Sequence, residues 1–587
     1  MDPAVRGHFA YDLKMTQNES DYTLTFKSTG AVESASVVLT PITSGAEAVT
    51  IEIDDVVAGE NTFVVDATTL GVGVKYNWAI ALDNPASPSV ELMYSDNSII
   101  YNNGTNDARI GLAIDKDVTS ANFGTIYTMT AMGQGLQKYT PDLLKNGSKL
   151  LTGMFGADTD ASTSTNKYVR SNRMTVNSGK VYIANYANQN SGLWVYDPSG
   201  TTATLFLPGF YERAVAFSGA GANRVMYVSH ESNFRYYNIG ANDSWSGDPT
   251  GTYTTNMING DGDIIATDKG MFISQNRFTG NNTSDVPVFQ FVGKNSGTVT
   301  FTSNVLSSTL TGSQSGGMAI SNDLSTFAIV DAQGDANVQV YGVSWSGETP
   351  SFTHKYSIPL VGTKQVDQMA FDYAGNLVIA SQQKGLLVYA IKTDARTTST
   401  PANTSLVIEG VAKPVVYPES LYLCGSLKAT DGQLNSEYSG AILNSTDEGV
   451  YTIESVELVG ACTEEGQEPQ KYAQFLFNAT TGTWDDVNAN LRYGAAEADT
   501  PIVLGEEMDV IEGANVWKVE PGIYKMIISV KDMVLIVSKI SDGIENINAD
   551  YNNAPVYYNL QGIEVTNPAN GIYIIKRGNK VTKEYVK

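Results

Sequence analysis

Short apolar stretches separated by polar turns recur through the middle of the chain. Each of four segments predicts a strand, a turn and a second strand: 172–185, 213–230, 317–331 and 368–381. Runs such as VYIAN and LVIAS are apolar at successive positions, which is typical of strands covered on both faces. A helical solenoid would instead space its apolar residues about three to four positions apart. The pattern therefore predicts a series of similar β-sheets.

A second signature follows these hairpins and consists of an apolar residue, one or two spacers and an aromatic residue. Six copies, 41 to 57 positions apart, end at Tyr139, Tyr196, Tyr237, Phe291, Tyr341 and Tyr389. This period, with four short strands in each unit, is typical of a β-propeller blade. Blades stack around an axis because one blade cannot cover both faces of its own sheet. We expect about six blades over residues 106–397, in a fold similar to propellers of the NHL and SMP-30 kinds.

Residues 1–105 carry shorter segments in which apolar and polar positions alternate. These segments are YTLTF (22–26), ASVVLTPI (35–42), VTIEIDDV (49–56), NTFVVDA (61–67) and KYNWAIALD (75–83). Strands at this spacing, joined by Gly and Asn turns, predict a β-sandwich of the immunoglobulin or fibronectin type. Trp78 is expected to anchor its core.

After the predicted propeller, residues 398–414 are rich in Pro, Thr and Ser without apolar periodicity, which predicts a linker. The next domain, 415–541, is a predicted β-sandwich that resembles modules of SusE and SusF, the starch-binding lipoproteins of the Bacteroidetes outer surface. The residues that carry this resemblance are Leu421, Tyr422 and Gly425 in the opening strand, and Pro521, Gly522 and Tyr524 near the close.

The last segment, 542–587, contains the motifs YNLQG (558–562) and GIY (571–573) and a Lys-rich closing strand. It resembles the C-terminal tail of exported Bacteroidetes proteins, which is related to type IX secretion sorting domains. The whole chain resembles uncharacterised exported multidomain proteins of gut Bacteroidetes that are suspected to serve polysaccharide use. The resemblance implies an extracellular or outer-membrane surface location. The given chain shows no signal or lipid anchor, so we expect that segment to be removed or to lie upstream.

Composition supports an almost all-β protein and narrows the choice of partners. The chain has 587 residues and a formal charge of −25, with 62 acidic against 37 basic residues. Such acidity disfavours nucleic acid and anionic lipid, which are bound mainly through Lys and Arg. No stretch of 18 apolar residues predicts a transmembrane segment. The two cysteines, Cys424 and Cys462, could form one disulfide or remain two buried thiols.

Motifs for metal or nucleophilic chemistry are weak in this sequence. It has no G-x-S-x-G elbow, P-loop or Rossmann fingerprint, and its three histidines share no short spacing, so we predict no metal site and no bound cofactor. The one partial match to a metal-binding motif is to a calcium-binding loop. The stretches 158–163 and 259–264 place oxygen ligands at alternate positions, but both depart from the EF-hand pattern and fit Asp-Gly turns.

Two residue types could bind or cleave sugars. If the propeller is an enzyme, Asp115, Glu212 and Asp372 are the channel acids expected near inner strands, although each also fits a turn-capping role. If it is a binding protein, Trp484, Trp245 and Trp345 flank polar turns and could stack on sugar rings, with local packing as the alternative.

The preferred hypothesis is a non-catalytic surface or secreted protein that binds polysaccharide, motivated by modular β architecture and missing catalytic motifs. One alternative is a propeller glycoside hydrolase or polysaccharide lyase with carboxylates in the central channel. A second alternative is a structural or adhesion protein that binds a surface protein.

Overall fold

The computed structural model describes most of the chain as two compact units, Met1–Lys413 and Pro414–Lys587. Outside the described residues are 1–2, 99–110, 130–135, 145–170, 186–190, 255–262, 275–288, 294–300, 303–316, 429–441, 463–467, 481–491, 541–554 and shorter gaps. Within the described part, helix is limited to the 3₁₀ turns η1 (Ala67–Thr69) and η3 (Gly221–Asn223). Neither could cross a bilayer, and no other described helix is long and apolar enough to do so. The chain is almost entirely β.

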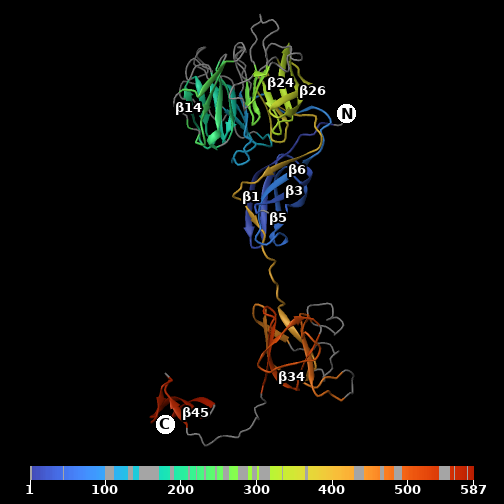
Figure 1. Cartoon of the computed structure of the whole chain (residues 1–587), viewed down its shortest axis with the longest axis vertical. Coiled ribbons are helices and arrows are strands. Elements are labelled where there is room, and N and C mark those ends of the chain that lie inside the picture. Colours follow the sequence, from blue (N-terminus) through green and yellow to red (C-terminus); the bar gives the residue numbers. More distant parts are fainter. Residues whose placement is uncertain are drawn as a thin grey trace. The chain divides into compact units, whose positions relative to one another are not determined.

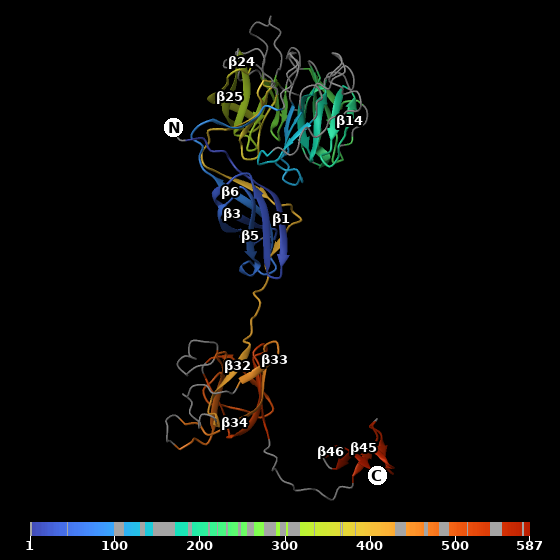
Figure 2. The same ribbon diagram turned by 180° about the vertical axis from the view of Figure 1, so that it is seen from behind.

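Six sheets make up the propeller in the first unit (Figures 1 and 2). Blade 1 contains β8 (Gly111–Ile114), β9 (Ile126–Met129) and β10 (Leu136–Tyr139). Blade 2 contains β11 (Ser171–Asn177), β12 (Lys180–Asn185), β13 (Gly192–Tyr196) and β14 (Ala203–Pro208). Blade 3 contains β15 (Glu212–Ser218), β16 (Val225–His230), β17 (Asn233–Asn238) and β18 (Gly251–Thr254). Blade 4 contains β19 (Ile264–Ala266), β20 (Gly270–Ser274), β21 (Phe289–Gly293) and β22 (Phe301–Thr302).

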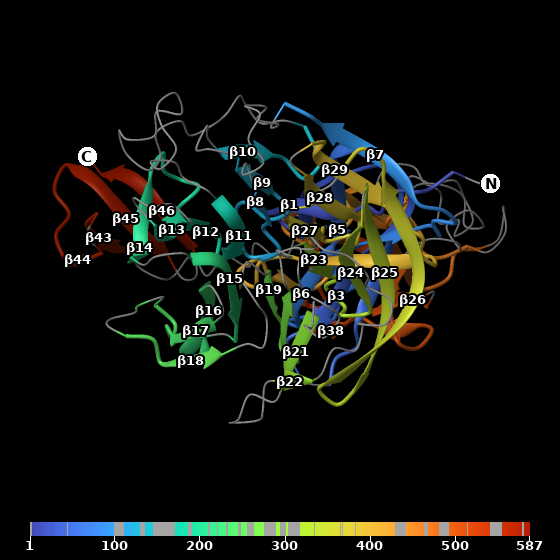
Figure 3. The ribbon, with the colours of Figure 1, turned by 90° about the horizontal axis from the view of Figure 1, so that it is seen from above.

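The last two blades include strands of unequal length. Blade 5 contains β23 (Met318–Ile320), β24 (Thr326–Gln333), β25 (Asp335–Ser346) and β26 (Thr349–Leu360). Blade 6 contains β27 (Gln368–Phe371), β28 (Leu377–Ser381), β29 (Gly385–Ala390) and, from an earlier part of the chain, β7 (Glu91–Asp96). The inner strands β8, β11, β15, β19, β23 and β27 contact one another in turn and close a ring (Figure 3).

Strand β7 closes the ring as the outer strand of the last blade. It pairs antiparallel with β29, from Leu386 opposite Asp96 to Ala390 opposite Glu91. Residues 91–96 fall within the range predicted for the first sandwich, so the structure moves this strand to the propeller. The sequence pattern missed it because an outer strand is covered on one face at most, and most of its side chains are exposed.

The propeller is inserted into the N-terminal sandwich. One sheet has the order β1 (Ala10–Asn18), β2 (Asp21–Ser28) and β5 (Gly59–Asp66). The other has the order β30 (Arg396–Pro401), β6 (Lys75–Asn84), β3 (Val32–Pro41) and β4 (Val49–Val56), with β31 (Ile408–Glu409) also pairing with β6. These orders correspond to strands A-B-E and G-F-C-C′ of an immunoglobulin-like sandwich. The whole propeller therefore lies between strands F and G, and Trp78 is buried in the sandwich core as expected.

The sequence pattern predicts a linker over residues 398–414. This prediction is wrong where β30 and β31 pair with β6 of the sandwich. Thr398 lies opposite Leu82 and Thr400 opposite Ile80, so β30 completes the sandwich sheet. Both threonines are buried, while Thr397, Ser399 and Pro401 are exposed. Threonine is β-branched and suits a strand, but its hydroxyl hides the alternation from a pattern based on apolar residues.

The C-terminal sandwich is one curled sheet around a core that includes Trp517. Its strands are β32 (Ser420–Gly425), β33 (Ile442–Asp447), β34 (Val450–Leu458), β35 (Ala473–Asn478), β36 (Arg492–Gly494), β37 (Thr500–Pro501), β38 (Glu507–Asp509), β39 (Ile511–Glu512), β40 (Trp517–Val519), β41 (Gly522–Ser529) and β42 (Val534–Lys539). Gly425 has a φ of +155°, and a Cβ there would meet the Gln474 carbonyl oxygen at 2.2 Å. The buried Tyr524 donates its hydroxyl to the Glu520 carbonyl. Cys424 and Cys462 are both buried free thiols.

The tail is a small sheet with the order β44 (Glu564–Val565), β43 (Val556–Tyr558), β45 (Gly571–Arg577) and β46 (Lys580–Val586). The YNLQG motif begins at Tyr558, the last residue of β43, and its Asn559 and Gly562 lie in the turn that follows. Here the Ile563 N–H donates to the Asn559 side chain at 2.9 Å, and Gly562 adopts a φ of +81°. The GIY motif begins β45. The motif residues therefore have a local folding role.

Candidate functional site

Side chains from blades 2, 4 and 6 connect blades that are not neighbours in the ring. Gln368, at the start of β27, accepts the backbone N–H groups of Leu112 in blade 1 and Met174 in blade 2, at 2.8 and 3.0 Å. Arg173 on β11 pairs with Asp263 just before β19, with Nε and Oδ1 3.3 Å apart and exposed fractions of 1% and 3%. Since β15 lies between β11 and β19, this ion pair spans the interior of the ring.

The structure does not bring the three candidate channel acids together. Asp115 follows β8 and Asp372 follows β27, so both lie at the carboxyl ends of inner strands. Glu212 is the first residue of β15 and lies at the opposite end of its strand. Because successive blades repeat one strand direction around the ring, Glu212 is separated from the two aspartates along the axis.

Asp115 and Asp372 both cap turns. The Ser120 hydroxyl and the Asp117 N–H donate to Asp115 at 2.6 and 3.1 Å. Asn376 donates its backbone N–H and its side-chain amide to the two oxygens of Asp372, at 2.8 and 2.7 Å. Burial raises the pKa of each carboxyl above its ordinary value, while these hydrogen bonds lower it. The turn-capping interpretation therefore accounts for their contacts.

Of the three candidate tryptophans, Trp345 alone lies within the described residues. Trp245 and Trp484 lie outside the described residues. Trp345 is half-buried on β25, donates its indole N–H to the Leu324 carbonyl at 2.9 Å and packs edge-on against Phe272.

The two candidate calcium-binding stretches are described only in part. Residues 158–163 lie outside the described part, and Asp263 of the second stretch pairs with Arg173. Among the described residues, no group of three or more acidic, His or Cys side chains could hold a metal ion.

The N-terminal segment joins the sandwich to blades 1 and 6. Gly7 exchanges two hydrogen bonds with the Asn376 side chain, both 2.9 Å long. Phe9 packs against Phe123 and Tyr373, with ring centroids 5.5 and 5.6 Å away. We call these contacts the junction. It bonds the N-terminal segment to the turn that Asp372 caps.

His8 is predicted to make the stability of the first unit depend on pH. Its ring lies over Gly30 and contacts the Thr29 hydroxyl at 3.3 Å, while its backbone bonds to the Asn84 side chain. Burial, with a smaller contribution from the Arg6 charge, lowers the pKa of His8 to about 4. The unfolded chain takes up this proton near pH 6.5, so the folded state loses stability as pH falls from 6.5 towards 4.

The variant His8→Gln is therefore expected to lose less stability than the wild type between pH 7 and pH 5, by about 1 kcal/mol after allowing for partial solvent screening. Denaturant unfolding of the first unit at both pH values measures this difference. His354→Gln is the matched control, because His354 is exposed on β26. An equal loss in wild type and His8→Gln would contradict the assignment.

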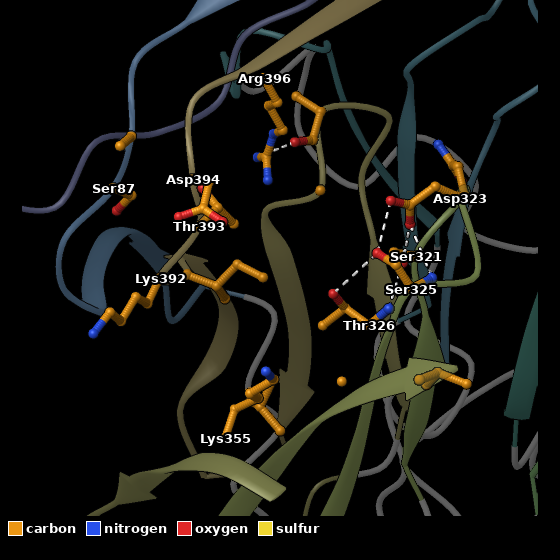
Figure 4. A pocket seen from close by; sticks show the side chains of 18 of the residues that line it. Ser87, Ser321, Asp323, Ser325, Thr326, Lys355, Lys392, Thr393, Asp394 and Arg396 are labelled. Carbon is orange, nitrogen blue, oxygen red and sulfur yellow. Dashed lines mark hydrogen bonds between the residues drawn. The ribbon is translucent and has the colours of Figure 1, made fainter. Parts of the chain in front are cut away.

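A cleft of about 1100 Å³ opens beside the junction (Figure 4). Its walls are residues of blade 5, the turn after β27, and the two segments of the chain that connect propeller and sandwich: 86–88, 321–323, 325–326, 340–344, 353, 355–356, 373–375 and 391–399. Hydroxyl side chains are frequent along it, including Ser87, Ser321, Ser325, Thr326 and Thr393.

The charged groups of this junction cleft are Asp323, Lys355, Lys392, Asp394 and Arg396. Burial favours the neutral form of Asp323, but hydrogen bonds from Ser321 and Ser325 hold its pKa below the ordinary value. Arg396 donates to the Ala374 carbonyl, and burial lowers its pKa. Burial also raises the pKa of Tyr356 to about 12. At neutral pH, the cleft therefore has three cations and two carboxylates.

Sequence reasoning missed the cleft entirely. Its residues come from segments up to about 300 positions apart, and none belongs to a recognisable motif. The local signal that could have helped is the cluster of Lys392, Arg396 and Asp394 immediately after the last repeat. A charged run of this kind is ordinarily solvated, so it predicts nothing specific.

No family model matches the chain, and no curated protein matches it. Among solved structures, it aligns with hydrazine synthase from Kuenenia stuttgartiensis at 13% identity, over 50% of this chain and 99% of that chain, with a TM-score of 0.34. It aligns with a structural genomics protein of unknown function from Bacteroides thetaiotaomicron at 13% identity, over 65% and 99%, with a TM-score of 0.33. The RRP9 WD40 repeats align at 10% identity, over 52% and 99%, with a TM-score of 0.33.

At these identities and TM-scores, the likenesses carry no argument about activity. The strand pairings themselves define the class. The chain is an all-β protein with an inserted six-bladed propeller, an immunoglobulin-like sandwich, a curled C-terminal sandwich and a small β tail.

Proposed function

We propose that this chain is a non-catalytic glycan-binding protein of the cell surface or the secreted fraction, and that the junction cleft is its binding site. The volume and the lining of this cleft are the main support for the proposal. Its volume of about 1100 Å³ lies slightly above the range of about 300–1,000 Å³ for small-molecule sites, which suits an oligomer better than a single small ligand. Its serine and threonine hydroxyls suit the hydroxyls of a sugar chain, because each can donate and accept a hydrogen bond.

Two resemblances agree with this proposal. The opening and closing strands of the C-terminal sandwich resemble modules of starch-binding surface proteins, and the tail resembles that of exported proteins. These likenesses supply the proposed location and the class of ligand. Asp115 and Asp372 cap turns, and Glu212 lies at the opposite end of its strand, so these positions give the enzyme alternative no specific support.

Affinity electrophoresis tests the proposal with gels that contain amylopectin, dextran, xylan or polygalacturonate. The full chain is expected to be retarded by at least one of them. Ala395→Trp places a large side chain on an exposed lining residue of the cleft and is expected to weaken retention at least about tenfold by blocking access.

Ala48→Trp is the matched control, because Ala48 is exposed in the loop between β3 and β4 and does not line the cleft. It should bind as the wild type does. No retention on any of the four gels would overturn the proposed function. Retention that Ala395→Trp leaves unchanged would overturn the assignment to this cleft.

A further inference from the structure

A β-bulge in blade 5 directs Lys355 towards the junction cleft. Along β25 and β26, Val340 lies opposite Tyr356 but Tyr341 lies opposite His354, which leaves Lys355 as an extra residue. A bulge of this kind turns a side chain out of the regular alternation and is common beside functional sites. Lys355 is exposed and lines the cleft.

Gly342 leaves the space that the Lys355 side chain occupies. A Cβ at Gly342 would lie 2.6 Å from Lys355 Cε and 3.5 Å from Nζ, so the aliphatic stem crosses directly over this glycine. The bulge and the glycine together position the ammonium group. Among the described residues, Lys355 has no ion-pair partner within 4.0 Å.

Arg396 faces Lys355 across the cleft, on the chain segment that leaves the propeller (Figure 4). Its guanidinium is anchored by the Ala374 carbonyl of the turn after β27. The charges of Asp372 and Asp323 also act on this guanidinium and raise its pKa against the effect of burial. Lys392 adds a third, exposed cation from the same segment.

Two carboxylates, Asp323 and Asp394, also line the cleft. Asp323 accepts hydrogen bonds from the hydroxyls of Ser321 and Ser325 and from the Ser325 N–H within its own turn, and its charge also acts on Arg396. Asp394 is exposed. Cations outnumber carboxylates here, in a chain with 62 acidic and 37 basic residues. This excess of one cation among the lining side chains favours an anionic ligand.

Building on the function proposed above, we infer that the junction cleft selects an acidic glycan, with Lys355 and Arg396 on opposite sides of a negatively charged sugar substituent. The substituent is a uronate carboxylate or a sulfate ester, since both present oxygens to ammonium and guanidinium groups. Hydroxyl side chains of the cleft would form hydrogen bonds with the remaining sugars of the glycan.

Paired ligands test the charge requirement, and titration calorimetry of the full chain measures affinity. Polygalacturonate is compared with its methyl ester, and dextran sulfate with dextran. In at least one pair, the charged polymer is expected to bind at least about tenfold more tightly than its neutral partner. Which pair responds separates carboxylate from sulfate. Equal affinities in both pairs would overturn the inference.

Three variants and one control assign the effect to Lys355. Lys355→Met removes the charge at similar length and should weaken binding of the charged polymer about three- to tenfold, whereas Lys355→Arg should retain it. Gly342→Ala keeps the charge but displaces the Lys355 stem, so it should weaken binding to a similar extent. Lys384→Met removes an exposed lysine outside the cleft and should change nothing. An equal effect of Lys355→Met and Lys384→Met would overturn the site in favour of general charge attraction.

The outcomes separate this inference from the proposed function. Binding of neutral polymers alone, abolished by Ala395→Trp, would overturn the acidic specificity and leave the glycan-binding function standing. Failure to bind any polymer would overturn both.

Discussion

Replacement of Arg173 by methionine is expected to destabilise the propeller by about 3–5 kcal/mol, because it leaves the Asp263 carboxylate buried without its partner. Both side chains are almost fully enclosed. The backbone N–H of Ile264 donates to Asp263 at 3.1 Å and only partly compensates. Denaturant unfolding, followed by hydrogen exchange in β11 and β19, measures the loss.

The double variant Arg173→Met, Asp263→Met is the control for this prediction. It removes both charges and is expected to recover much of the loss, since an apolar pair of similar volume is often as stable as a buried ion pair. A loss below about 1 kcal/mol in the single variant would contradict the assigned role.

The pH dependence of the single variant follows from the same pair. Burial raises the pKa of Asp263 to about 6, although Arg173 lowers it. A raised pKa means that the folded state binds this proton more readily than the unfolded chain does, so the contribution of Asp263 to stability falls as pH rises from about 4 towards 6. Arg173→Met should therefore be less damaging at pH 5 than at pH 7.

The second large effect is expected at the junction, where Phe9→Ala should destabilise the first unit by about 3–5 kcal/mol. Phe9 is 1% exposed and packs edge-on against Phe123 and at a tilt against Tyr373. Loss of the ring leaves a cavity between the N-terminal segment and blades 1 and 6. Hydrogen exchange at Gly7 is expected to rise, because its N–H donates to the Asn376 side chain and this hydrogen bond loses its support.

Two comparisons control for a general loss of stability. Phe63→Ala makes the same truncation at a half-buried position of β5, packed against the sandwich core away from the junction, and should leave exchange at Gly7 unchanged. The C-terminal unit is an internal reference that neither variant should alter. If Phe9→Ala costs less than about 1 kcal/mol, or Phe63→Ala raises exchange at Gly7 equally, the junction has a different basis.

Because the propeller is inserted between β6 and β30, the sandwich sheet is complete only when the chain returns from the propeller. Strand β30 pairs with β6 across an interval of more than 300 residues. The entropy of closing so long a loop rises only logarithmically with its length, so the insertion is tolerated. Strand β7 leaves the same sandwich and completes blade 6. The chain segments that lead into β7 and into β30 thus connect the sandwich and the propeller, and residues of both segments line the cleft.

The amino-acid sequence by itself determined the repeating unit, because local alternation and buried runs reflect the two faces of each strand. The blade hairpins, five sandwich strands and the buried Trp78 and Trp517 could all be predicted in this way. The turn-capping role of Asp115 and Asp372 was also one of the alternatives visible in the sequence. Each of these features depends on neighbours within a short stretch of chain.

Only the tertiary structure decided which strands complete each domain and where the cleft lies. The sequence pattern places β7 in the sandwich and β30 in a linker because their partners are hundreds of residues away. The side chains of β7 are mostly exposed, and those of β30 are polar. Lys355 reaches the cleft through a bulge, and Arg396 through the return of the chain to the sandwich. Pairing and charge placement of this kind depend on long-range closure, which leaves no periodic signal in the sequence.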